Sequence, residues 1–92
     1  MDHLTLDENG KLKFPCVYPL KVFGKDEDDF EHYVLTLLRE FLSEEIEISM
    51  SSKLSSKGSY LAVTATFVAS SREQIDAIYT SFSSNKRILM LI

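Results

Sequence analysis

The hydrophobic residues of this 92-residue chain recur with two different periods, and the order of these periods limits the possible folds more than any other feature. A period of two residues is typical of strands, and a period of three to four residues is typical of amphipathic helices. From residue 14 onward the order is strand, helix, strand, strand, helix, strand. It predicts an α+β fold in which a four-stranded, mainly antiparallel sheet carries two helices on one face.

The first half of the pattern runs from residue 14 to residue 43. Residues 14–23 read FPCVYPLKVF and predict a strand in which two prolines limit pairing near the start. Gly24 ends the strand, and the acidic residues 26–29 stand where negative charge favours a helix N-terminus. The helix is predicted to end near Ser43. Its buried stripe consists of Phe30, Val34, Leu37, Leu38 and Phe41.

The second half of the pattern contains a two-stranded hairpin, a helix and a last strand. Alternation predicts strands over residues 46–51 and 60–69, and the polar stretch between them is predicted to be the hairpin loop. A capping box at Ser70 or Ser71 precedes the second helix. Residues 88–92 are apolar and predict the last strand. The buried stripe of the second helix consists of Ile75, Ile78, Tyr79 and Phe82.

The order βαββαβ with two right-handed crossovers gives the ferredoxin-like topology, a two-layer sandwich. Residues 1–13 mix charges, contain the turn signal Asn9-Gly10 and show no sustained period. We therefore predict a flexible N-terminal arm over residues 1–13 and a single ferredoxin-like domain over residues 14–92.

Composition narrows the class of protein. No apolar run approaches the roughly 20 residues that span a bilayer, and the first residues are too charged for a secretory signal peptide. Cys16 is the only cysteine, and neither His3 nor His32 stands at a metal-ligand spacing from it. The net charge of −4 disfavours nucleic acid as a partner. We predict a cytoplasmic protein without metal, cofactor or membrane contact.

The residues after the first strand disfavour an enzyme of this fold class. An acylphosphatase needs an arginine in a phosphate-binding loop there, whereas this loop is acidic after Gly24 and Lys25. Cys16 is interpreted as a small buried hydrophobic residue, since no histidine is placed to activate it. Lys57-Gly58-Ser59-Tyr60 is similar to a run in RNA-recognition motifs, but Tyr60 is the only aromatic residue on the outer face of that strand.

Two features remain as candidate binding sites. The hairpin segment collects serine hydroxyls, Lys53, Lys57 and Gly58, which can present donors to an anion or simply form a solvated turn. The sheet face away from the helices is too apolar to be fully solvated, since alternation places Val17, Phe23, Val68, Leu89 and Leu91 there. A homodimer or partner interface explains this face, although the arm could cover part of it.

Four segments in order resemble one known family. They are FPCVYPLKVFG (14–24), SSKGSY (55–60), REQIDAIY (72–79) and RILMLI (87–92). Together they resemble the YbeD-like family of small uncharacterised bacterial proteins. The resemblance implies a ferredoxin-like fold similar to the ACT domains that bind small effectors and regulate amino-acid enzymes, and it implies no established activity. Gly24 matches the position of a glycine that lets the ACT backbone approach its effector.

The leading hypothesis is therefore a non-enzymatic regulatory or adaptor module that binds a small-molecule effector or a protein partner. An acylphosphatase-type hydrolase and an RNA-binding domain are the alternatives. We expect the outer face to pair through Val17, Phe23, Leu89 and Leu91. The residues expected to bind the ligand or partner are Lys21, Gly24, Ser55, Ser56, Lys57, Gly58 and Tyr60.

Overall fold

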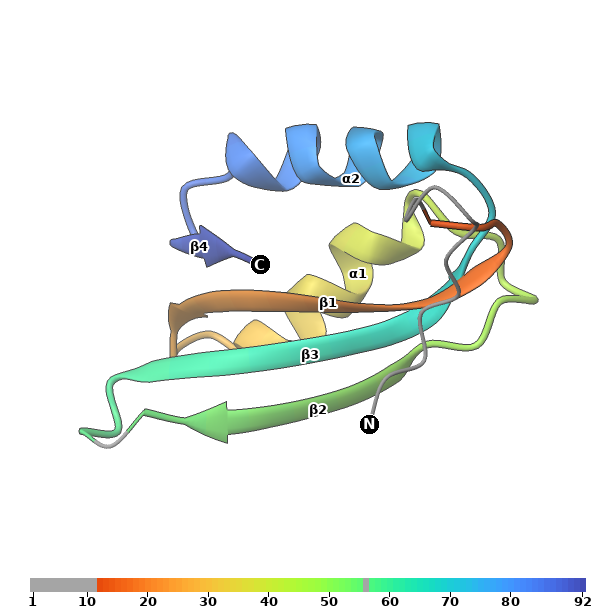
Figure 1. Cartoon of the computed structure of the whole chain (residues 1–92). Helices are drawn as coiled ribbons and strands as arrows, with labels where there is room; N and C mark the ends of the chain where they lie inside the picture. Colours follow the sequence, from red (N-terminus) through yellow and green to blue (C-terminus); the bar gives the residue numbers. More distant parts are fainter. Residues whose placement is uncertain (1–11, 56) are drawn as a thin grey trace.

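The computed structural model describes residues 12–55 and 57–92, and its elements follow the predicted order. All neighbouring strands are antiparallel, in the order β2-β3-β1-β4. Both helices lie on one side of the sheet and neither covers the other side (Figure 1), which confirms the ferredoxin-like α+β fold. The elements are β1 (Cys16–Lys25), α1 (Phe30–Arg39), β2 (Ser49–Leu54), β3 (Tyr60–Ala69), α2 (Arg72–Ser83) and β4 (Met90–Leu91).

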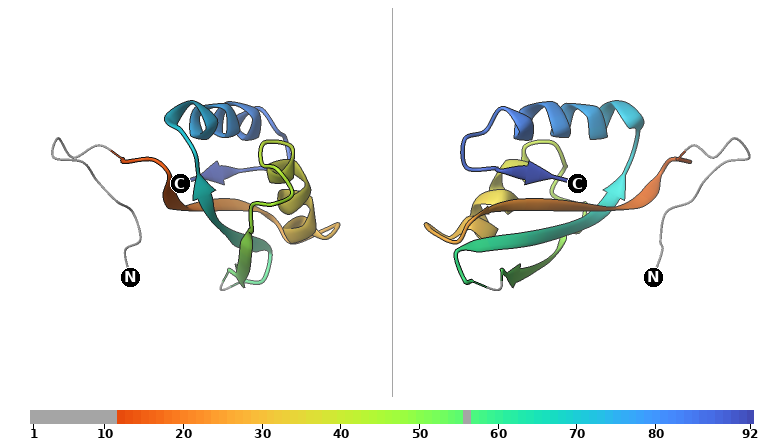
Figure 2. Two further views of the ribbon diagram at one scale, coloured as in Figure 1. Left: turned by 90° about the vertical axis from the view of Figure 1, so that its right-hand side faces the viewer. Right: turned by 60° about the vertical axis from the view of Figure 1, so that its left-hand side comes forward.

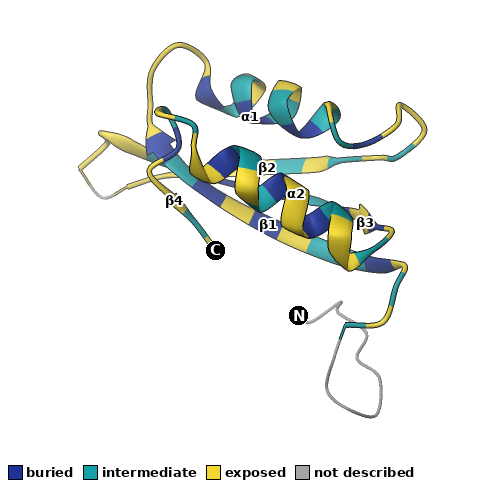
Figure 3. Cartoon of the chain, turned by 90° about the horizontal axis from the view of Figure 1, so that it is seen from above, coloured by how far each residue is buried: buried dark blue, intermediate teal, exposed yellow. Residues whose placement is uncertain are grey.

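The core lies between the sheet and the helices, which two further views place on the same side (Figure 2). Seen from the helix side, buried positions recur along each helix and alternate along β1 (Figure 3). These are the predicted periods, so the helical stripes are confirmed as core. The largest fully buried side chains are Phe30, Phe82, Leu20, Leu38, Ile78, Val22, Val34 and Val63.

β1 tolerates a proline because half of one edge has no neighbouring strand. It pairs with β3 along its whole length but with β4 only at Val22 and Phe23. The Lys21 N–H donates to Ile92 O at 3.3 Å, so the backbone nitrogens of alternate residues face the β4 side. Pro19, two residues earlier, therefore directs its missing N–H at the unpaired edge. Proline limits pairing on that edge alone.

α1 ends at Arg39, earlier than the predicted end near Ser43. The N–H groups of residues 40–42 bond to carbonyls three residues back, at 2.9–3.3 Å, which is a tighter turn than an α-helix. The Arg39 guanidinium donates to Ser43 O at 2.7 Å and to Ile46 O at 2.8 Å. These bonds turn the chain towards β2 while its apolar residues still pack on the core, so the periodicity outlasts the helix.

The second strand was predicted over residues 46–51, but β2 runs from Ser49 to Leu54. Ile48 packs against the core before the ladder begins. Ser52, which was predicted in the loop, lies opposite the buried Val63, and its hydroxyl donates to the Glu31 carboxylate on α1. The prediction was wrong because hydrogen bonding to β3, rather than apolar alternation, defines this polar edge strand.

The capping box of α2 forms at Ser71. The Ser71 hydroxyl accepts from the Gln74 N–H at 3.1 Å, and the Gln74 side-chain oxygen accepts from the Ser70 N–H at 2.9 Å. The Gln74 amide nitrogen also donates to Phe41 O at 3.2 Å. One side chain thus closes the start of α2 and joins it to the turn that follows α1.

The phase predicted for the last strand was wrong at Leu91. Leu91 pairs with the buried Val22 and packs against the core, so it lies on the helix side of the sheet. Ile88 is buried too, although strict alternation would place these two residues on opposite faces. The segment before Met90 is irregular and shifts the phase, so that Met90 lies opposite Phe23 on the outer face.

The predicted arm lies outside the described residues except for its last two. Of these, Leu12 packs against the core and Lys13 is exposed. No helix in the part of the chain that the structure describes is long and apolar enough to cross a membrane.

Candidate functional site

The predicted hairpin loop is a short turn closed by its own polar groups. The Ser55 N–H donates to Tyr60 O at 2.8 Å, and the Ser55 hydroxyl accepts from the Tyr60 N–H at 3.2 Å. Gly58 has φ of 73° and donates its N–H to Ser55 O at 2.9 Å. Lys57 is exposed, and Ser56 lies outside the described residues. Ser55 and Gly58 therefore have structural roles in the turn.

Gly24 has a packing role. An alanine Cβ at this position would overlap the ring of Phe30 and lie 2.7 Å from the carbonyl oxygen of Arg87. The glycine thus lets two other segments approach β1, and these segments occupy the space beside its Cα. The role of an effector-binding glycine, which the family resemblance implied, stays a prediction.

Lys21 lies apart from the hairpin turn. It faces outward in the middle of the sheet, opposite Thr64 on β3 and Ile92 beyond β4. Tyr60 pairs instead with Lys25, four residues further along β1, or roughly 13 Å at the rise of an extended strand. The structure therefore brings Tyr60 and Gly24 near one end of the sheet and leaves Lys21 on its open face.

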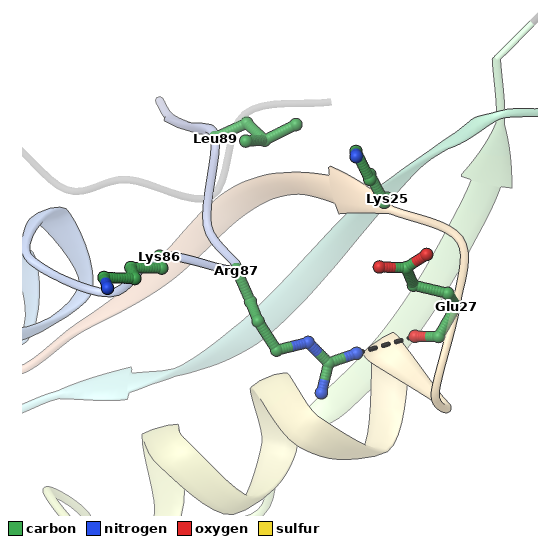
Figure 4. Close-up of a pocket in the computed structure, with 5 residues that line it drawn as sticks. All are labelled: Lys25, Glu27, Lys86, Arg87 and Leu89. Atoms are coloured by element: carbon green, nitrogen blue, oxygen red, sulfur yellow. Dashed lines mark hydrogen bonds between the residues drawn. The ribbon is translucent and has the colours of Figure 1, made fainter.

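Sequence analysis missed Arg87, which lies at the loop after β1 (Figure 4). Its guanidinium donates to Glu27 O at 2.6 Å and to Asp28 O at 3.2 Å, and it stacks 4.1 Å from the ring centre of Tyr33. The loop thus has an arginine after all, brought from about 60 residues away. The local sequence carries no signal of this contact.

Arg87 also lines a cavity of about 250 Å³ at this end of the sheet. Three cationic side chains and one carboxylate surround the cavity, and Leu89 lies at its rim (Figure 4). Leu89 is 55% exposed, and its N–H donates to Phe23 O at 2.8 Å just before β4 begins. Leu89 thus lines this cavity, and its expected place on the outer sheet face stays a prediction. The lining residues are Lys25, Glu27, Lys86, Arg87 and Leu89.

The outer face of the sheet carries side chains in rows that cross the strands. One row contains Lys53, Ala62, Phe23 and Met90, and the next contains Ser51, Thr64, Lys21 and Ile92. Val17 and Phe23 face outward as predicted, because their neighbours Cys16, Leu20 and Val22 point into the core. Exposed apolar groups remain at both ends of this face, where Val68 is 44%, Met90 55% and Ile92 62% exposed.

The charges on this face are of one sign. Every aspartate and glutamate among the described residues lies in a helix or a connecting segment, and none lies on a strand. The outward positions of the strands include Lys21, Lys25 and Lys53. In an acidic chain, the outward positions of the described strands thus carry no aspartate or glutamate, and their charged side chains are lysines.

The helix side holds the titratable groups whose pKa values are displaced. Burial raises the pKa of the Cys16 thiol, in agreement with its interpretation as a buried hydrophobic residue. The Tyr18 and Tyr79 hydroxyls lie 3.0 Å apart. Burial, followed by the hydrogen bond with Tyr18, raises the pKa of Tyr79 well above its ordinary value. In the described residues no group of three His, Cys, Asp or Glu side chains is placed to hold a metal ion.

We expect the stability of the protein to fall above about pH 10, where an unfolded tyrosine ionises. The folded state keeps Tyr79 protonated because its pKa is raised, so its contribution is full below that pH and decreases as the pH rises. Urea unfolding between pH 8 and 11 measures the effect. Tyr79→Phe should make this decline in stability less steep. In an ultraviolet titration of the tyrosines, it should also remove the phenol that ionises at the highest pH. An unchanged decline in Tyr79→Phe would contradict the assignment.

A family model described as "Protein of unknown function (DUF493)" matches residues 9–92. A UPF0250 protein of Chromobacterium violaceum is 34% identical over 87 residues, which covers 94% of this chain and 98% of the relative. A UPF0250 protein of Neisseria gonorrhoeae is 31% identical over 91 residues, with coverage of 97% and 100%. Another, from Nitrosomonas europaea, is 28% identical over 87 residues, with coverage of 95% and 100%.

The solution structure of protein HP0495 from H. pylori superposes with a TM-score of 0.65 and covers 100% of this chain and 98% of its own. At 14% sequence identity this likeness shows the shared fold alone. The family model and the relatives confirm the resemblance drawn from the four sequence segments. The chain belongs to the UPF0250 (DUF493), YbeD-like family of small bacterial proteins, whose function is unknown.

Proposed function

We propose that this protein is a non-enzymatic regulatory or adaptor module of the cytoplasm that binds a partner protein on the open face of its sheet. The observation that carries the proposal is the combination, on a face that neither α1 nor α2 covers, of exposed apolar side chains and lysines that form no ion pair with any residue the structure describes. Val68 and Met90 expose about half of their surface there. Val68 lies opposite Val17 and Met90 lies opposite Phe23, so apolar surface is exposed at both ends of the face. Exposed apolar surface of this kind on a small domain is typical of an interaction site.

The surroundings of Arg87 support binding rather than hydrolysis. A phosphate-binding arginine directs its N–H groups at the substrate, whereas Nη2 of this guanidinium donates to two carbonyl oxygens and its centre lies over the Tyr33 ring. Asn85 is engaged as well, since its amide donates to the Tyr33 hydroxyl at 2.7 Å and its oxygen accepts from the Arg87 N–H at 2.9 Å. Both side chains hold the α2–β4 connection against α1.

The charges favour a different protein over a second copy as the partner. A symmetric face-to-face pair would place Lys21, Lys25 and Lys53 of both copies in one interface without a carboxylate from either face. Like charges brought together in a buried interface oppose association. A homodimer through this face is therefore the less favourable arrangement.

Native mass spectrometry of the protein purified from its producing cells tests the proposal. We expect a protein bound at fixed stoichiometry. We expect Val68→Ser/Met90→Ser to weaken its binding by about tenfold or more, because the variant removes apolar contacts at both ends of the face. The matched control is Leu54→Ser. Leu54 is 51% exposed but lies opposite Leu61, on the helix side of the sheet.

Three results would overturn this proposal. The bound protein is retained by the double variant, the control variant loses it equally, or the parent chain carries only a small molecule or a second copy of itself. The melting temperatures of all variants, measured by circular dichroism, should stay close to that of the parent because these side chains are exposed.

A further inference from the structure

On one half of the open face, lysines surround a small group of apolar side chains. We call it the lysine-rimmed patch: its apolar centre is Phe23, Ala62 and Met90, and its rim is Lys21, Lys25 and Lys53. Lys21 and Lys25 flank Phe23 at two residues on either side, and Lys53 lies opposite Ala62. A desolvated apolar centre with a polar rim is the usual anatomy of a protein interface.

None of the three rim lysines forms an ion pair with another residue of segments 12–55 and 57–92. The only ion pair found among the described residues joins Arg72 to Asp76 on α2. Of the acidic run at residues 26–29, Glu27 lines the same cavity as Lys25 without forming an ion pair with it, and the run then continues into α1. Lys21 and Lys53 lie outside that cavity, and we take the charge of the rim to be available for an external anion.

We infer that the occupant of the lysine-rimmed patch is an acidic segment of another protein, which places an apolar side chain on the centre and carboxylates beside the rim lysines. This inference rests on the function proposed above and adds the chemistry of the partner. Electrostatic complementarity of this kind selects partners and accelerates their encounter.

The outer face fits this occupant better than a nucleic acid or a membrane. Bases need several aromatic surfaces for stacking, and the outward positions offer only the half-buried Phe23 and Tyr60. A lipid surface would have to cover the hydroxyl rows of β2 and β3, which include Thr64 and Thr66. Three lysines contribute only about 1 kcal/mol each to binding an anionic bilayer.

Synthetic peptides provide a direct test on the full chain. The probe is a short peptide with one leucine flanked on both sides by glutamates. The matched peptides have lysines in place of the glutamates, or serine in place of the leucine. We expect the acidic leucine peptide to shift the amide resonances of residues in and around the patch, and to bind about tenfold or more tightly than either matched peptide. Its affinity should fall as salt is added.

Charge-reversal variants distinguish the effect of the rim lysines on peptide binding from the effect of the net charge of the protein. Lys21→Glu/Lys53→Glu should abolish binding of the acidic peptide. The control Lys13→Glu/Arg72→Glu changes the net charge equally, with Arg72 exposed on α2 on the helix side, and should leave binding within about twofold of the parent. No binding, equal binding of the lysine peptide, or resonance shifts away from the patch overturns the inference. Tighter binding of single-stranded RNA or of anionic phospholipid vesicles assigns the face to those classes instead.

The two proposals fail in different ways. If the cellular partner is lost by Val68→Ser/Met90→Ser but retained by Lys21→Glu/Lys53→Glu, the open face binds a protein and the acidic chemistry is wrong. If neither variant loses the partner, the open face itself is the wrong surface.

Discussion

Gly24→Ala should destabilise the domain by about 3 kcal/mol, since overpacking a tightly packed site costs roughly 1–3 kcal/mol and this site has little room to relax. The new methyl group would overlap the ring of Phe30 and approach the Arg87 carbonyl oxygen to 2.7 Å. The ring can move only by leaving the core, and the carbonyl belongs to the backbone. Thermal unfolding should show a melting temperature lower by roughly 15 °C for a domain of this size.

Gly58→Ala is the matched control for this prediction. Gly58 has φ of 73°, and nothing lies within 4 Å of the position its Cβ would take. Alanine there meets only the cost of a left-handed backbone, about 1 kcal/mol. If the two variants lose the same stability, steric crowding at Gly24 is not the cause. An intact Gly24→Ala domain that fails to bind its partner would instead restore a binding role for this residue.

Phe30→Ala should cost about 4 kcal/mol, since removing a fully buried phenylalanine leaves a cavity as well as the lost transfer free energy. Phe30 is 1% exposed at the start of α1, and the Arg87 guanidinium lies 5.6 Å from its ring centre. Its loss affects the core, the Gly24 contact and the cation–π contact together. Such a loss approaches the whole stability of many small domains. Urea unfolding at neutral pH measures it.

Phe23→Ala provides the comparison with a half-buried ring. It removes the same atoms from the outer face, where solvent replaces the ring and no enclosed cavity forms, so the free energy of unfolding should fall by only about 1–2 kcal/mol. A loss at Phe23 equal to that at Phe30 would mean that the outer face is part of the core. The lysine-rimmed patch would then be ruled out as an interface.

The part of the candidate site that could be predicted is the part that depends on local alternation. Val17 and Phe23 face outward because β1 is a long regular strand with its buried residues in phase. The turn at Gly58 was also visible, since glycine after an exposed lysine between two strands indicates a tight hairpin. The hydrogen bond that the Ser55 hydroxyl accepts within that hairpin could not be predicted from the sequence.

Other features of the site depend on contacts between distant segments. Arg87 reaches the loop after β1 only because β4 pairs beside that strand. Met90, rather than Leu91, belongs to the outer face because the irregular segment after α2 shifts the strand by one position. A shift of one residue exchanges the two faces of a strand, so a two-residue strand carries too little alternation to fix its own phase.

The sequence by itself determined the order of the elements, the buried stripes of both helices and the presence of a cap at Ser70 or Ser71 before α2. Each follows from residues close together in the chain, such as Ser71 and Gln74. Only the tertiary structure decided where β2 begins, which face Leu91 occupies and why Gly24 must lack a side chain. In these cases the deciding partner, Thr66, Val22 or Arg87, is remote in sequence and becomes a neighbour only when the sheet forms.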